Sequence, residues 1–193
     1  AHMSQDPAWL EAFRAGADIH ARTAAEVFGL KMDEVTPALR SAAKAINFGI
    51  VYGISSFGLS KGTGLPVQEA QAYIDRYFEK YTGVKEYLDR TVEEAREQGY
   101  VTTLFNRRRY LPDIRSRRWA LRSFAERAAM NAPIQGSAAD IIKKAMIAVE
   151  QRIAASNLRA KMLLQVHDEL VFEVHMEDLL PAAHLIKETM EGI

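Results

Sequence analysis

The sequence contains no cysteine and no long uninterrupted apolar stretch. Without cysteine it can form neither a disulfide framework nor a thiolate metal site, which is typical of proteins in a reducing cytosol. No apolar run approaches the ~18 residues needed to cross a membrane, and no charged segment followed by an apolar one opens the chain. We therefore expect a soluble, cytoplasmic protein without a membrane partner.

A net charge is also absent. Lys plus Arg and Asp plus Glu both number 25, so the total charge gives no support to nucleic-acid binding. The 193 residues, 48% of them hydrophobic and 26% charged, suffice for one sizeable core or two small lobes and argue against disorder. Any nucleic-acid site must therefore come from local clustering of cations.

The stretch 40–53 predicts a helix with an unusual exposed stripe. Two like charges one turn apart destabilise an isolated helix by ~0.2–0.5 kcal/mol, so this spacing indicates an anion opposite them. Arg and Lys suit a polyphosphate, and the aromatic side chains suit a sugar or a base. The alternative is a solvated basic face beside two core aromatics, and periodicity alone does not decide between them. The stripe consists of Arg40, Lys44, Phe48 and Tyr52, with Ala42, Ala43, Ile46 and Ile50 on the packing side.

Two short helices, 7–15 and 19–28, are predicted before this stretch, and Asp18 is placed to cap the second. Thr36 and Pro37 then begin the striped helix as its N-cap and first residue. His20 lies in the first turn of the second helix. A histidine there is commonly a surface or capping residue, and a ligand contact is the alternative.

The middle of the chain predicts further helices packed through an apolar stripe. Gly62 and Gly64 mark a turn and not a phosphate loop, because no strand precedes them and no GK[ST] follows. A helix from Pro66 and another over 84–98 follow. The stripe of the first of these, which we expect in the core, is Ala70, Tyr73, Ile74, Tyr77 and Phe78.

A basic cluster hidden by the neutral total follows a predicted small hairpin of residues 100–104 and 109–111. Backbone phosphates of a nucleic-acid duplex are its natural partner, and a surface charge network with Asp113 and Glu126 is the alternative. The following helix is predicted to run to about Asn131, to be interrupted by Pro133, and to resume over 138–155. The cluster comprises Arg107, Arg108, Arg109, Arg115, Arg117, Arg118 and Arg122.

The segment 161–174 predicts a hairpin with His167, Asp168 and Glu169 at or near its turn. Adjacent side chains on a strand point in opposite directions, so Asp168 and Glu169 would not normally share one ligand. At a turn this rule is relaxed. Hard oxygen ligands with few protein contacts suit magnesium, which keeps its waters and binds substrate phosphates. An acid-rich turn without any catalytic role is the commoner alternative.

Three motifs in this order resemble family A DNA polymerases, the bacterial DNA polymerase I type, and the resemblance spans nearly all of the chain. They are RxxxKxxxFGxxYG from Arg40 to Gly53, NAPIQGSAAD over 131–140, and QVHDE over 165–169. The resemblance implies an α+β fold, with a mostly helical fingers subdomain and a partial palm that carries an antiparallel β-hairpin. It implies three regions: 1–20 as the palm edge leading into the fingers, 21–115 as fingers, and 116–193 as partial palm.

The same resemblance implies the roles of individual residues. Magnesium is the expected cofactor, and Asp168 its ligand, with Glu169 an accessory carboxylate; Lys44 joins these two as a candidate catalytic residue. Deoxynucleoside triphosphates and primer–template DNA are the expected partners. The nucleotide contacts are His20, Arg40, Lys44, Phe48 and Tyr52, and the DNA contacts are Arg127, Asn131, Gln135 and His167.

The implied activity is template-directed transfer of a deoxynucleotide to a primer 3′-hydroxyl in DNA replication or repair, by a monomer in the bacterial cytosol or nucleoid. The second aspartate of the family's two-metal site belongs to a DYSQIELR-like segment that is not in this sequence, so we expect the chain to be a catalytically incomplete fragment. The alternatives are a nucleotide- or DNA-binding module and a helical structural piece. A single-subunit RNA polymerase is the nearest enzymatic rival, but Glu169 and the Phe48–Tyr52 pattern fit the DNA branch better.

Overall fold

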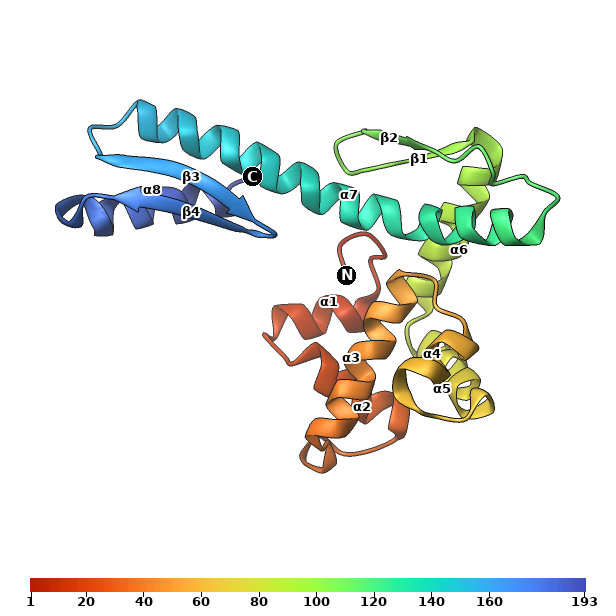
Figure 1. Cartoon of the computed structure of the whole chain (residues 1–193). Coiled ribbons are helices and arrows are strands. Elements are labelled where there is room, and N and C mark those ends of the chain that lie inside the picture. Colours follow the sequence, from red (N-terminus) through yellow and green to blue (C-terminus); the bar gives the residue numbers. More distant parts are fainter. The chain divides into compact units, whose positions relative to one another are not determined.

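The computed structural model describes residues 1–193, which form two compact units. The first comprises residues 1–102 and 106–134, and the second comprises 103–105 and 135–193. Most of the chain is helical and two antiparallel hairpins complete it, which confirms the predicted α+β class (Figure 1). The division into regions 1–20, 21–115 and 116–193 remains a prediction. No helix has both the length and the apolar character that crossing a membrane requires.

The first unit starts with helices whose ends follow the predicted caps. The Asp18 carboxylate accepts hydrogen bonds from the backbone N–H groups of His20 and Ala21, both at 3.0 Å, and so begins α2. Thr36 caps α3 at Leu39 N, with Pro37 in the first turn. These contacts satisfy orphan N–H groups at the helix starts. The opening elements are α1 (Pro7–Arg14), α2 (Ile19–Phe28), the 3-10 helix η1 (Met32–Glu34) and α3 (Pro37–Val51).

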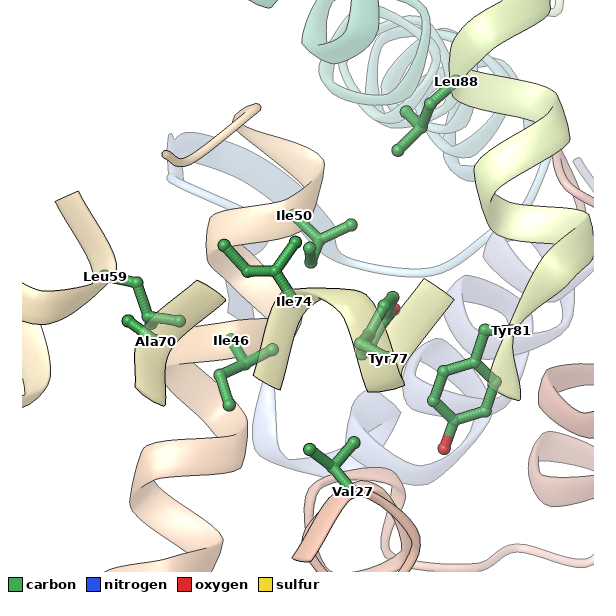
Figure 2. Close-up of a cluster of buried hydrophobic side chains, with 9 residues drawn as sticks. All are labelled: Val27, Ile46, Ile50, Leu59, Ala70, Ile74, Tyr77, Tyr81 and Leu88. Atoms are coloured by element: carbon green, nitrogen blue, oxygen red, sulfur yellow. The ribbon is translucent and has the colours of Figure 1, made fainter. Parts of the chain in front are cut away.

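The main hydrophobic core of this unit lies between α2, α3 and α5, as Figure 2 shows. Ile46 and Ile50 of α3 and Ile74 and Tyr77 of α5 are buried, so the packing side predicted for both helices is confirmed. Burying side chains of this size stabilises a fold by roughly 1.5–3 kcal/mol each. The core therefore fixes α3 firmly against its neighbours. The helices that follow α3 are α4 (Ser56–Thr63), α5 (Val67–Lys80) and α6 (Thr82–Gln98).

The predicted small hairpin is present, with a shorter first strand than expected and a second strand that starts one residue earlier. It consists of β1 (Tyr100–Thr102) and β2 (Arg108–Tyr110), with Val101 paired with Arg109. Val101 is buried in a second cluster that includes Leu111 and Ala129.

The predicted interruption at Pro133 is wrong, because α7 (Trp119–Ala154) runs through it as one helix. A proline inside a helix removes one backbone hydrogen bond and crowds the carbonyl four residues earlier, at a cost of ~3 kcal/mol. Here Ala129 and Ala132, on the turn before it, are buried in the second cluster. Breaking the helix there would give up this packing, which explains why tertiary contacts override the local preference.

The second unit holds the rest of α7 and the predicted 161–174 hairpin. Its strands are β3 (Ala160–Val166) and β4 (Glu169–Val174), with Val166 paired with Glu169, so two residues form the turn. The register shifts between Met162 and Leu164, which leaves one extra residue in β3, as in a β-bulge. The 3-10 helix η2 (Met176–Asp178) and α8 (Leu179–Glu191) complete the unit; no sequence pattern predicted α8.

Gly53, directly after α3, provides a test of the fold. Its φ is +63°, and an added Cβ would lie 2.9 Å from Arg127 Cγ, whereas a Cβ at Gly62 in α4 would meet nothing. We predict that Gly53→Ala lowers the free energy of unfolding by about 1–2 kcal/mol, because L residues are strained in this region. Gly62→Ala should raise it by about 0.5–1 kcal/mol. Urea unfolding followed by circular dichroism measures both, and equal effects would contradict the assigned turn.

Candidate nucleotide and metal site

The stripe on α3 faces solvent along its whole length. Arg40 and Lys44 are exposed, and the Phe48 and Tyr52 side chains are 51% and 49% exposed. The alternative in which these aromatics belong to the core is therefore wrong. Tyr52 is the C-cap residue, so the stripe ends where the helix ends.

Residues of α2 and α3 come together on this face. The rings of His20 and Phe48 are 5.9 Å apart, and the Lys44 ammonium lies 5.9 Å from the centre of the same Phe48 ring. Lys44 takes part in no ion pair. The structure thus places a histidine, a lysine and an exposed aromatic side by side.

Arg40 already has an anion beside it. Its Nε donates to Asp18 Oδ2 at 2.7 Å, while its two Nη groups carry no hydrogen bond. This hydrogen bond is the largest cause of a lowered Asp18 pKa, and the backbone N–H of Ala21 contributes next. The anion that the like charges indicated is therefore, in part, a carboxylate of the chain itself. Sequence reasoning assigned Asp18 only a capping role and missed the ion pair.

His20 is held from the side of the core by Asn47, a residue that the sequence analysis did not single out. Asn47 is 4% exposed, and its Nδ2 lies 3.0 Å from His20 Nδ1 and 3.1 Å from Thr23 Oγ1. Partial burial is the main cause of a lowered His20 pKa, and the charge of Arg40 adds to it. Both effects favour the neutral form of His20. The missed signal was a lone amide on the alanine- and isoleucine-rich side of α3.

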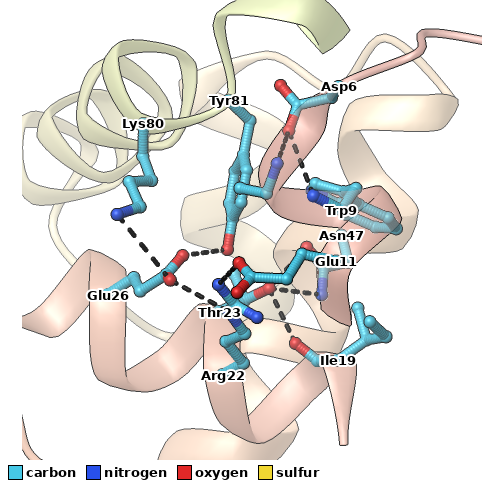
Figure 3. Close-up of polar contacts among 11 residues, drawn as sticks. Asp6, Trp9, Glu11, Ile19, Arg22, Thr23, Glu26, Asn47, Lys80 and Tyr81 are labelled. Carbon is cyan, nitrogen blue, oxygen red and sulfur yellow. Dashed lines mark hydrogen bonds and ion pairs between the residues drawn. The ribbon is translucent and has the colours of Figure 1, made fainter. Parts of the chain in front are cut away.

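A polar network around Arg22 and Glu26 anchors α2 to its neighbours (Figure 3). Arg22 bonds to Glu11 of α1 at 3.0 Å and to Glu26 at 3.1 Å. Tyr81 donates to Glu26, and burial followed by this carboxylate raises the pKa of its hydroxyl. The network joins α2 to α1 and to Tyr81 and so fixes the helix that carries His20 and Asp18.

The predicted DNA-contact residues of α7 lie in both units. Arg127 donates to Ser123 Oγ at 2.7 Å, and Asn131 Nδ2 is buried without a hydrogen-bond partner. Gln135 is exposed and belongs to the second unit. A buried donor without a partner is unusual in a folded protein, so the Asn131 amide nitrogen has a hydrogen bond left to donate.

The arginine cluster is partly a structural network. Glu126 lies 2.8 Å from Arg96 and 3.8 Å from Arg122, and Arg115 donates to backbone carbonyls at the end of α6. The alternative of a surface charge network is therefore correct in part, because Glu126 pairs with arginines of the chain. Arg109, Arg117 and Arg118 are exposed and form no ion pair.

The turn between β3 and β4 carries the acidic residues, as predicted. His167 and Asp168 are its two central residues, Glu169 starts β4, and all three side chains are exposed. His167 has a φ of +54°, a conformation in which glycine is usual, so the backbone is strained here. No group of three or more His, Cys, Asp or Glu side chains is arranged to hold a metal ion. Two exposed carboxylates still fit magnesium, which needs only one or two from a protein.

The ion pair at Arg40 generates a prediction about Asp18. Replacing Arg40 with Gln should raise the Asp18 pKa towards its ordinary value, while Lys44→Gln should leave it unchanged. Because the folded pKa is the lower one, the pair stabilises the fold above the unfolded pKa of ~3.9 and stops doing so as pH falls through the folded pKa. Titration of the carboxyl ¹³C shifts by NMR measures this, and an unchanged Asp18 pKa in Arg40→Gln would contradict the pairing.

The whole chain is similar to known proteins. The sequence model of the family described as DNA polymerase family A matches residues 1–193. The chain is 56% identical over 192 residues to DNA polymerase I of Streptococcus pneumoniae and 54% identical over 191 residues to that of Bacillus caldotenax. Each alignment covers 99% of this chain and 22% of the relative, so the chain spans about a fifth of the relatives it matches.

A solved structure matches in the same way. The POL domain of Pol1 from M. smegmatis, in complex with DNA primer-template and dNTP, superposes with a TM-score of 0.93 at 47% identity. The match covers 98% of this chain and 34% of that one. Because the family model matches all 193 residues of the chain, the chain belongs to DNA polymerase family A.

Proposed function

We propose that this chain binds a deoxynucleoside triphosphate on the exposed face of α2 and α3, as part of a template-directed DNA polymerase. The observation that carries the proposal is the juxtaposition of His20, Lys44 and Phe48, with Arg40 on the same stripe. The related POL domain of Pol1 is complexed with primer-template and dNTP, which supports the same partners for this chain. We expect a cytoplasmic location for it, and the monomeric state stays a prediction.

The side chains of this face suit different parts of the nucleotide. Arg40 has two free Nη groups for phosphate oxygens even while its Nε contacts Asp18. Lys44 adds a point charge that no carboxylate of the chain neutralises. Neutral His20 can donate one N–H to a phosphate oxygen. Phe48 offers an apolar surface for the sugar, and Tyr52, at the end of α3, is proposed to lie near the templating base.

The proposed reaction joins the primer to the α-phosphate. The 3′-hydroxyl loses its proton to solvent and its oxygen forms a bond to the α-phosphorus. The bond from that phosphorus to the bridging oxygen breaks, and pyrophosphate leaves with the electron pair of that bond. Charge on the leaving phosphates grows during this step, and Lys44 and Arg40 would neutralise it. The chain thus contributes positioning and charge rather than a covalent intermediate.

Asp168 is the proposed magnesium ligand, and Glu169 an accessory carboxylate. When bound, the ion would neutralise phosphate charge and favour ionisation of the primer hydroxyl. His167, Arg127, Asn131 and Gln135 are the proposed contacts to primer–template. An amide and a guanidinium can donate to the acceptors that all base pairs present in the minor groove, so these contacts would check pair geometry without reading sequence.

The proposal predicts which side chains bind phosphate. Arg40→Ala and Lys44→Ala should each weaken binding of a deoxynucleoside triphosphate by about 10–100-fold, the value of a charged hydrogen bond of ~1.5–3 kcal/mol. Both substitutions should weaken the binding of inorganic tripolyphosphate to a similar degree. Phe48→Ala should weaken only the binding of the nucleotide, because tripolyphosphate has no sugar. Isothermal titration calorimetry measures all three.

The matched control is Lys85→Ala, since Lys85 is an exposed lysine of α6 paired with Asp89. It should leave both affinities unchanged. Binding that is equally insensitive to Arg40→Ala, Lys44→Ala and Lys85→Ala would refute the proposed site. Losses of the same size in all three would show nonspecific attraction of the anion to positive charge.

A further inference from the structure

Asn47 is a polar residue inside the packing between α2 and α3. It is 4% exposed, and Ile46 beside it and Ile50 one turn later are buried in the main core. A buried amide is costly unless its hydrogen bonds are made. Both hydrogens of its Nδ2 are used, one towards His20 and one towards Thr23.

The direction of these hydrogen bonds follows from a backbone carbonyl. Ile19 O can only accept, and Thr23 Oγ1 lies 2.8 Å from it, so the single hydroxyl proton of Thr23 points there. Thr23 must then accept from Asn47, and the amide group 3.1 Å from it must be the nitrogen. The Asn47 oxygen lies farther from that hydroxyl, at 3.3 Å. Figure 3 shows this path from Ile19 through Thr23 to Asn47.

The same nitrogen faces His20 Nδ1 at 3.0 Å, so Nδ1 must be the acceptor and carry no proton. A neutral imidazole with an unprotonated Nδ1 has its proton on Nε2. Nε2–H is then the one ring donor left for a ligand. The network therefore determines which His20 nitrogen can donate to a phosphate.

We propose that Asn47 is a positioning residue that holds His20 as the neutral Nε2–H tautomer, so that this histidine donates a hydrogen bond to the phosphate of the bound nucleotide. The inference rests on the proposed function and deepens it. Asn47 does not touch the nucleotide in this account, and its effect passes entirely through the imidazole.

Charged groups around His20 favour the neutral form on balance. Arg40 and Lys44 of α3 disfavour a third positive charge, and burial acts in the same direction, whereas Asp18 at the start of α2 opposes them. A neutral donor is therefore compatible with the two neighbouring cations. Phe48 packs near the ring without adding charge.

The wild-type chain provides the first test, which needs no variant. In a ¹⁵N-histidine-labelled chain above the imidazole pKa, we expect the His20 Nδ1 resonance to have the chemical shift of an unprotonated nitrogen and Nε2 that of a protonated one. The reverse assignment would overturn the inference, and so would an equal mixture of the two tautomers.

The second test is Asn47→Asp, which is nearly isosteric. A carboxylate cannot donate, so His20 Nδ1 must carry the proton: the His20 pKa rises, and the neutral ring presents a lone pair at Nε2. Affinity for a deoxynucleoside triphosphate should fall about 10-fold as pH rises through the imidazole pKa measured by NMR. Wild type should show a smaller change, because its neutral ring keeps the Nε2–H donor. A flat profile in the variant would overturn the inference.

The double variant Asn47→Asp with His20→Gln separates the imidazole from the added charge. Repulsion by the new carboxylate persists in it, but the pH-dependent step should disappear. A step that remains would show that another group titrates. Circular dichroism checks folding of each variant, and Thr23→Ser, which keeps the hydroxyl, should behave as wild type.

These outcomes separate the two proposals. If His20→Gln alone weakens nucleotide binding about 10-fold while the tautomer or the pH step is not as expected, the role of Asn47 is refuted and the nucleotide site stands. If neither His20→Gln nor Arg40→Ala changes the affinity, the proposed function itself fails.

Discussion

The packing of α2 against α3 is the contact on which the proposed site depends, because neither helix carries it alone. His20 and Asp18 belong to the start of α2, and Arg40, Lys44 and Phe48 to α3. Polar links cross between the helices at the surface, from Arg40 to Asp18, and inside, from Asn47 to His20 and Thr23. The buried apolar side chains supply most of the stability, while these links fix rotation and register. Side chains from two helices thereby meet with defined partners.

The ion pair between Arg40 and Asp18 can be replaced by a contact from Arg40 to a ligand. An exposed ion pair such as Arg40 with Asp18 contributes little to stability, commonly ~0–1 kcal/mol, so a polyanion can compete for the guanidinium without destabilising the fold. Asp18 also keeps its backbone N–H contacts at the start of α2, so it remains ordered if Arg40 turns to a ligand. The same carboxylate orients the arginine beforehand, which lowers the entropy lost when a ligand binds.

Sequence alone predicted the features that depend on local chemistry. The caps at Asp18 and Thr36 and the turn at His167 and Asp168 follow from residues within a few positions of one another, and all were confirmed. The continuous helix through Pro133 was not predictable, because only distant packing partners offset the cost of the proline. Asn47 was missed for a related reason: its partners are on another helix, and helical periodicity places a residue on a face without identifying what it touches there.

The central claim is that a nucleoside triphosphate binds against the stripe of α3, and the most direct test is an experimental structure of the chain with a deoxynucleoside triphosphate. We expect phosphate oxygens beside Arg40, Lys44 and His20 Nε2, with the sugar near Phe48. Phosphates bound instead against Arg109, Arg117 and Arg118, with Arg40 still held by Asp18 alone, would contradict it.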